Sequence, residues 1–119
     1  MIGKWHLGSD PTGFDRWIVL PGQGAYWNPV LLVPGHKLTI EGHCTTITTD
    51  LGLEFLKTRP PDKPFFLFHS LQAVHLPSFA APRFRGKSPA GPHGDFILQL
   101  DHIVGALMDA LEQHGIADN

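Results

Sequence analysis

The order of apolar patterns along this 119-residue chain predicts an α/β fold with a mainly parallel sheet flanked by helices. Two observations carry the prediction. At about 45–57, apolar residues recur every four positions, and an apolar run follows at 64–70. A longer pattern with helical spacing occupies about 95–114. A buried strand between two helices is typical of parallel sheets, whose strands are joined by helical crossovers.

The first third of the chain shows little regular pattern. Met1-Ile2 leads into Gly3-Lys4-Trp5-His6-Leu7-Gly8, which we interpret as a short strand followed by a loop. Residues 9–36 carry many Gly and Pro residues and no sustained periodicity, so they predict a long ordered loop. Long ordered loops in compact domains often carry function.

The middle of the chain predicts a helix and then a strand. Ile47, Leu51 and Phe55 recur at helical spacing, Thr45 or Thr46 is suited to cap the start, and Pro60-Pro61 would end the helix. The run 64–70, Pro-Phe-Phe-Leu-Phe-His-Ser, predicts a short and fully buried strand. A Pro-rich loop follows through Ala90.

The last element is the clearest. One helical face of about 95–114 would carry Phe96, Leu100, Ile103, Val104, Leu107 and Leu111. Gly115 is well placed as the left-handed residue that ends this helix. A further strand would be expected next, so we expect residues 1–119 to be one incomplete domain, an internal part of a larger one.

Composition excludes several classes of function. The formal charge of −2 argues against a general nucleic-acid or anionic-membrane binder, because both need a basic face. No apolar run approaches the roughly 20 residues of a membrane span. The single cysteine, Cys44, cannot form an internal disulfide or a Cys-rich zinc site, and we expect it to be a small buried apolar residue.

Two short segments could carry chemistry. Lys4 and His6 stand two residues apart, so in extended backbone they would face one pocket suited to an anion. His75 follows the predicted strand, and its ordinary pKa of about 6.5 suits general acid–base catalysis. From these residues alone, a surface lysine and a structural histidine are the favoured interpretation of Lys4 and His6, and a structural loop histidine is an equal alternative for His75.

The sequence also resembles a known family. Gly3-Lys4-Trp5-His6-Leu7-Gly8 is similar to the second signature of the sulfatases, in the alkaline phosphatase superfamily. The resemblance continues in order through further segments: Gly13–Trp17, Leu20–Gly24, Pro64–Leu67, Val74–Pro77, Phe84–Ser88, Gly94–Phe96, Leu100-Asp101, Val104-Gly105 and Gly115–Asn119.

The resemblance implies a fold and a chemistry. The chain would be part of an alkaline-phosphatase-like three-layer sandwich, in a sulfuric ester hydrolase whose nucleophile is a formylglycine hydrate. Lys4 matches a lysine that contacts the nucleophile and the sulfate, and His6 a histidine that hydrogen-bonds the hydrate. His75 matches a second histidine, near the sulfate and the leaving oxygen. Gln23 stands where some relatives place a polar substrate contact.

Departures from the family pattern bear on the nucleophile and the metal. Cys44 is followed by Thr45-Thr46, so it does not match the formylglycine motif C-x-P-S-R. The family implies Ca²⁺ in the full-length protein, but we assign no metal ligand within this chain, because Asp118-Asn119 follows the helix end directly. The other histidines, at positions 36, 43, 69, 93, 102 and 114, match no family role.

Three functions stay open at this point. The first is a sulfatase fragment that carries part of the sulfate pocket and is inactive alone; its substrate would be a sugar, aryl or lipid sulfate. The second is a phosphate or phosphonate ester hydrolase of the same superfamily. The third is a non-catalytic module that binds an anion or a partner. The family implies a periplasmic, secreted or lysosomal location.

Overall fold

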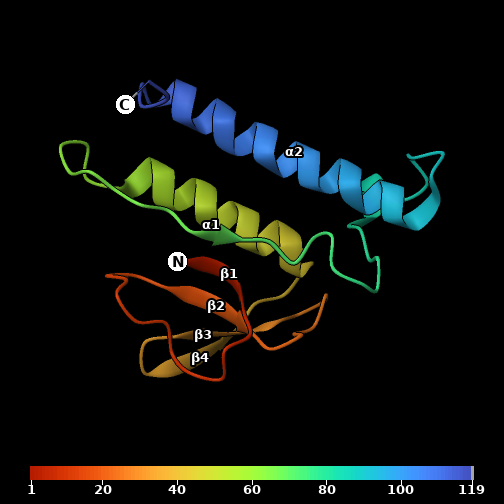
Figure 1. The fold of residues 1–119 in the computed structure, drawn as a ribbon, viewed down its shortest axis with the longest axis horizontal. Helices are drawn as coiled ribbons and strands as arrows, with labels where there is room; N and C mark the ends of the chain where they lie inside the picture. The colour runs from red at the N-terminus through yellow and green to blue at the C-terminus, as the bar shows by residue number, and fades with distance from the viewer. Residues whose placement is uncertain (119) are drawn as a thin grey trace. The chain divides into compact units, whose positions relative to one another are not determined.

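The computed structural model describes residues 1–118, and the order of elements is β1–β4, α1, β5, a 3₁₀ turn and α2 (Figure 1). The chain divides into two compact units. The first comprises residues 1–48 and 66–72, and the second comprises residues 49–65 and 73–119. The α/β class predicted from the sequence is confirmed.

The first unit holds a five-stranded sheet in the order β4-β3-β2-β1-β5. Its strands are β1 (Ile2–Trp5), β2 (Ile18–Pro21), β3 (Val30–Val33), β4 (His36–Thr39) and β5 (His69–Ser70). β1 pairs in parallel with β2 and with β5, whereas β3 pairs antiparallel with β2 and with β4. The sheet is therefore mixed: a parallel part, β2-β1-β5, is extended by an antiparallel hairpin.

The prediction of a loop over residues 9–36 was wrong, because β2, β3 and the start of β4 lie within it. These strands have four residues each, too few to show an alternating pattern between Gly- and Pro-rich turns. Pairing with neighbouring strands stabilises them instead: β2 pairs with β1, with Ile2 opposite Ile18, and β3 pairs with β2, with Leu32 opposite Val19.

The prediction of a fully buried strand over residues 64–70 was wrong in extent and in burial. Only His69 and Ser70 form a strand, and Phe66 exposes 76% of its surface. β5 is the edge strand of this sheet, so one side of the run has no partner strand among the described residues. The apolar sequence alone does not distinguish an edge segment from a buried central strand.

Helix α1 (Cys44–Thr58) confirms the predicted helix but starts earlier, which places Thr45 and Thr46 inside it and rules them out as caps. Its first amide is satisfied differently, because the Cys44 N–H donates to the Tyr26 carbonyl at 2.7 Å. Cys44 is fully buried, as predicted, and burial raises the pKa of its thiol to about 11.

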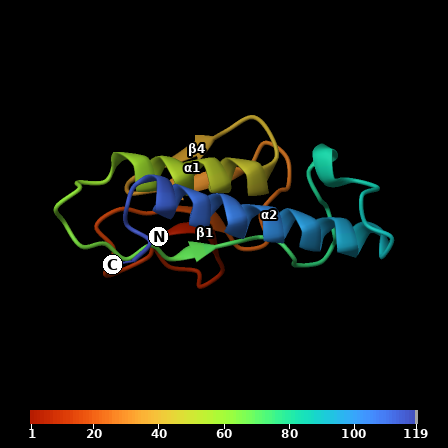
Figure 2. The same cartoon turned by 90° about the horizontal axis from the view of Figure 1, so that it is seen from above.

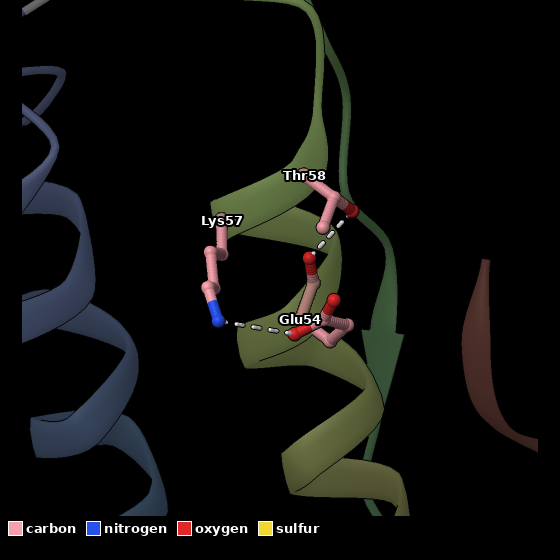
Figure 3. Close-up of polar contacts among 3 residues, drawn as sticks. All are labelled: Glu54, Lys57 and Thr58. Atoms are coloured by element: carbon pink, nitrogen blue, oxygen red, sulfur yellow. Dashed lines mark hydrogen bonds and ion pairs between the residues drawn. The ribbon is translucent and has the colours of Figure 1, made fainter.

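Two polar contacts join residues in the last turn of α1, which belongs to the second unit (Figure 3). Thr58 donates its hydroxyl to the Glu54 carbonyl at 2.7 Å, and Lys57 Nζ lies 4.0 Å from Glu54 Oε2. Both charged side chains are mostly exposed, so this ion pair contributes at most a few tenths of a kcal/mol. Arg59 then stacks on the Phe65 ring, 4.9 Å from its centroid, beyond the end of the helix.

Helix α2 (Gly91–Gln113) confirms the second predicted helix, and both views show it beside α1 (Figures 1 and 2). Phe96 and Ile103 are buried as predicted, but Val104 is 49% exposed. Gln99, which lies between Phe96 and Ile103 in the sequence, is also buried, although as a polar residue it is not part of the apolar pattern. No helix among residues 1–118 is long and apolar enough to cross a membrane.

The end of α2 was also predicted correctly. Gly115 adopts φ +64°, its N–H bonds to the Glu112 carbonyl, and the Ile116 N–H bonds to the Leu111 carbonyl at 3.0 Å. These two bonds make a Schellman motif, which satisfies the last carbonyls of the helix. Glycine adopts the left-handed backbone at position 115 at little cost.

Candidate active site

The parallel part of the sheet brings polar residues together at the carboxyl edge of its strands. β1 ends in Lys4-Trp5 and is followed by His6, and β2 is followed by Gly22-Gln23. Parallel strands deliver the residues that follow them to one edge of the sheet, which is where α/β proteins place their ligands. This arrangement joins residues almost twenty positions apart in the sequence.

Gly3 permits this arrangement. It adopts φ +112°, and a Cβ at this position would collide with the backbone carbonyl of Ser70 in β5. Position 3 therefore requires glycine for two reasons: its backbone conformation and the close approach of β1 to β5. The next residue along β1 is Lys4, so the close approach sets where that lysine emerges.

Lys4 and Gln23 are in direct contact. Lys4 Nζ donates to Gln23 Oε1 at 2.7 Å, a short charge-assisted hydrogen bond. The Gly22 N–H donates to the Trp5 carbonyl at 3.0 Å, which anchors the same turn to β1. The structure thus brings together two of the four residues predicted for the site.

His6 lies beside the same turn. A Cβ built on Gly22 would be 4.0 Å from His6 Nε2, so the imidazole borders the backbone that precedes Gln23. The loop beyond His6 is held by Trp5, whose indole N–H donates to the Ser9 carbonyl at 2.6 Å. His6 and Gln23 are exposed and Lys4 is partly buried, so all three can be reached from solvent.

The turn after Gln23 is fastened to the start of α1 by polar and aromatic contacts. Asn28 Oδ1 accepts the Gly42 N–H at 2.9 Å, and the Asn28 N–H donates to the Gly42 carbonyl at 2.8 Å. The buried His43 ring meets the Trp27 ring edge-on, with centroids 5.5 Å apart. The connection between β2 and β3 is therefore firmly held, and residues 22–24 lie at its start.

One further member of this cluster, Gln72, was not predicted from the sequence. Its side-chain Nε2 donates to the Gln23 carbonyl at 3.1 Å, across 49 positions of sequence, and the residue is only 4% exposed. A lone glutamine before a loop gives no signal in a single sequence, because glutamine is common on protein surfaces.

His75 lies in the second unit, in the loop that follows Gln72, and its side chain is exposed. Its Nδ1 is 2.5 Å from the Leu76 carbonyl, so this nitrogen carries a proton and donates. Proton exchange with a substrate would then use Nε2. The predicted meeting of His75 with Lys4 and His6 stays a prediction.

No group of three or more His, Cys, Asp or Glu side chains in residues 1–118 is arranged to hold a metal ion. These residues therefore do not fit a calcium site, and no step of the proposed chemistry uses one. Asn119 lies outside the described residues. His69 has both ring nitrogens buried without a hydrogen-bond partner in the described part of the chain, and burial lowers its pKa, which favours the neutral ring.

A shallow groove between α1 and α2 contains none of the predicted site residues. It has a volume of about 430 Å³ and is lined by Asp50, Leu53, Glu54, Lys57, Ala106, Asp109, Ala110, Gln113 and His114. Charges of both signs at mostly exposed positions are typical of a solvated helix surface.

Comparison with known proteins assigns the class. The sulfatase family model matches residues 1–119, so this chain belongs to the sulfatase family. The N-acetylglucosamine-6-O-sulfatase of Bacteroides thetaiotaomicron is 42% identical over 89 residues, which are 72% of this chain and 16% of that protein. Human N-acetylgalactosamine-6-sulfatase is 31% identical over 144 residues, covering 100% of this chain and 28% of its own length.

Solved structures agree with this assignment. A structure in complex with its substrate D-glucosamine-2-N,6-O-disulfate shares 40% identity and a TM-score of 0.67, over 72% of this chain and 18% of that one. A second, from glycosaminoglycan metabolism in Bacteroides thetaiotaomicron, has a TM-score of 0.83 at 25% identity, over 99% of this chain and 40% of that one. The chain spans less than a third of the length of the N-acetylglucosamine and N-acetylgalactosamine sulfatases named above.

Proposed function

We propose that this chain supplies part of the substrate pocket of a sulfatase that removes a 6-O-sulfate from an N-acetylated or N-sulfated hexosamine. The observation that carries the proposal is the cluster of Lys4, His6 and Gln23 at the carboxyl edge of parallel strands. Several similar proteins act on amino sugars sulfated at position 6, which supports the substrate class.

Lys4 would bind the sulfuryl group. Its ammonium is a fixed positive charge, and Gln23 Oε1 holds it by the hydrogen bond of 2.7 Å. As the sulfate ester is cleaved, negative charge moves toward the bridging oxygen, and a preorganised cation stabilises that charge better than mobile water does. His6, beside the same turn, would add a second donor to the sulfuryl oxygens.

His75 would act on the leaving oxygen. Nδ1 is bonded to the Leu76 carbonyl, so in the imidazolium form Nε2 carries the proton that passes to the sugar oxygen as the S–O bond breaks. The sulfuryl group goes to a nucleophile supplied from outside residues 1–119. Cys44 is not that nucleophile, because it is fully buried and its thiol pKa is raised to about 11.

Leaving-group dependence tests the assignment in the full-length protein. His75→Ala should lower kcat/KM for N-acetylglucosamine 6-sulfate by roughly 10²–10⁴-fold, and by much less for nitrophenyl sulfate, whose leaving group needs no acid. Lys4→Ala should slow both substrates, because it removes charge stabilisation at the sulfuryl group itself.

The matched controls are His36→Ala and Lys37→Ala, which alter exposed residues of the same types on β4. Both controls should retain wild-type kcat/KM. Equal slowing of the two substrates in His75→Ala would make His75 a sulfate contact and not an acid. Faster cleavage of nitrophenyl phosphate than of the sulfate by the wild type would replace the proposed reaction with phosphate ester hydrolysis.

A further inference from the structure

Gln72 occupies a position at the same sheet edge as the proposed sulfate-binding lysine. In the pairing of β1 with β5, Gly3 lies opposite Ser70, so the chain beyond Ser70 leaves the sheet alongside Lys4 and Trp5. Gln72 is the second residue past Ser70, and its side chain is turned inward, with 4% of its surface exposed.

The side-chain amide of Gln72 binds Gln23, which in turn binds Lys4. Gln72 Nε2 donates to the backbone carbonyl of Gln23 at 3.1 Å, while Gln23 Oε1 accepts from Lys4 Nζ at 2.7 Å. The acceptor is a carbonyl, so the nitrogen of Gln72 must face it, which settles the orientation of this amide. Three residues from three segments of the sheet edge are thus linked, with Gln23 bonded to Gln72 through its backbone and to Lys4 through its side chain.

The other end of the Gln72 amide is unsatisfied. Its Oε1 is buried and has no hydrogen-bond partner within residues 1–118. A buried polar atom without a partner opposes folding, so an apolar side chain of similar size would suit this position better for stability alone. What glutamine adds at this position is the single bond to Gln23.

We infer that Gln72 is a positioning residue that orients Lys4 through Gln23, an inference that rests on the proposed sulfatase function. It touches neither substrate nor reacting atoms. Without its N–H donor, the turn at Gln23 loses its attachment to the segment after β5, and the Lys4 ammonium loses its fixed direction. Misplacement of a group that stabilises the transition state lowers kcat more than it raises KM.

The first test is the state of the Lys4 ammonium in the full-length protein, and it does not depend on activity. In ¹⁵N spectra of lysine ammonium groups, wild-type Lys4 should give a slowly exchanging signal, and Gln72→Leu and Gln23→Ala should both abolish it. Lys37, which is exposed on β4, is the internal control. A Lys4 signal unchanged by Gln72→Leu would overturn the inference.

The second test uses kinetics of the full-length protein. Gln72→Leu should lower kcat by roughly 10- to 100-fold with little change in KM. In the background of Lys4→Ala it should lower kcat no further, because both changes remove one function. Additive losses in the double variant would show that Gln72 does not act through Lys4.

The third test is a pH profile that a purely structural role would not produce. In Gln72→Glu the ionised carboxylate faces the Gln23 carbonyl and repels it, whereas the protonated acid can donate as the amide did. Burial raises the pKa of such a carboxyl, so the ratio of variant to wild-type kcat should rise as the pH falls from about 8 to 5. A ratio independent of pH contradicts the inference. An inactive wild type would refute the proposed function, and the ammonium spectra would still decide the geometry.

Discussion

Asp95 in the second unit and Gln72 in the first are both almost fully buried polar residues, and the side chain of each binds the backbone of a loop. Asp95 Oδ1 accepts the N–H groups of Lys87 and Ser88, at 2.9 and 2.7 Å, and Oδ2 accepts that of Gly86 at 2.7 Å. Gln72 makes one bond and leaves its oxygen unpaired. Both carboxylate oxygens of Asp95 have hydrogen-bond partners, which indicates a structural role. Only one end of the Gln72 amide has a partner, which fits the positioning role inferred above.

The same comparison extends to Gln99 on α2. This residue is 1% exposed, and its Oε1 accepts the N–H of the buried Ala81 at 2.8 Å. In the second unit, buried polar side chains thus supply the acceptors that irregular backbone needs. In the first unit, the corresponding bond goes to the backbone of Gln23, an exposed residue.

The largest effect should come from removing the close approach that aligns the first unit. Gly3→Ala places a Cβ against the Ser70 carbonyl and forces a non-glycine residue to φ +112°. We expect a loss of about 3 kcal/mol or more in the free energy of unfolding, measured by urea denaturation.

Gly8→Ala is the matched control for this substitution, because Gly8 also has positive φ but its Cβ would meet open space. It should cost only ~1 kcal/mol. Equal losses for the two variants would mean that the contact between β1 and β5 is looser than the position of Ser70 indicates.

Asp95→Asn should lower the melting temperature by several degrees at neutral pH, because the amide turns a donor toward one of three backbone N–H groups. The hydrogen bonds from Ser88, Gly86 and Lys87 hold the pKa of Asp95 below its ordinary value of 3.8. A lowered pKa in the folded state means that the ionised form stabilises the fold above pH 3.8, and that this stability is lost as the pH falls through the folded pKa.

The pH dependence makes this prediction specific. The difference in melting temperature between wild type and Asp95→Asn should be constant from about pH 5 to 7 and should shrink steadily below about pH 4. The measurement is a series of thermal melts across that range. A difference that stays constant down to about pH 2 would show that the carboxylate charge is not what holds the loop.

The smallest expected change in stability comes from replacing Gln72, and it should differ from the change caused by replacing Gln99. Gln99→Leu leaves the buried Ala81 N–H unpaired and should cost ~1–3 kcal/mol of unfolding free energy. Gln72→Leu removes an unsatisfied buried oxygen and frees the backbone carbonyl of Gln23, an exposed residue, so it should change stability by less than about 1 kcal/mol. Denaturation of both variants by urea makes the comparison. A larger loss for Gln72→Leu than for Gln99→Leu would mean that Gln72, too, is a structural residue.

The helices α1 and α2 could largely be predicted from the sequence. The spacing of Ile47, Leu51 and Phe55 indicated α1, and Gly115 marked the end of α2. These features are local, because a helix bonds residues four positions apart and its cap is formed within a few residues. Val104 lies on the predicted apolar face but is 49% exposed, because the pattern marks a helical face and not which of its residues other elements cover.

The first unit was predicted less well, because its bonds join distant residues. The sequence by itself indicated a short strand beside Lys4 and His6, a buried Cys44 and the α/β class, although the structure places Lys4 within that strand. Only the tertiary structure decided that β2 and β3 exist, that Phe66 is exposed, and that Gln72 reaches Gln23 across 49 positions. The physical reason is that strand pairing and polar contacts of this kind depend on which segments the sheet brings side by side, and no local pattern of residues records that choice.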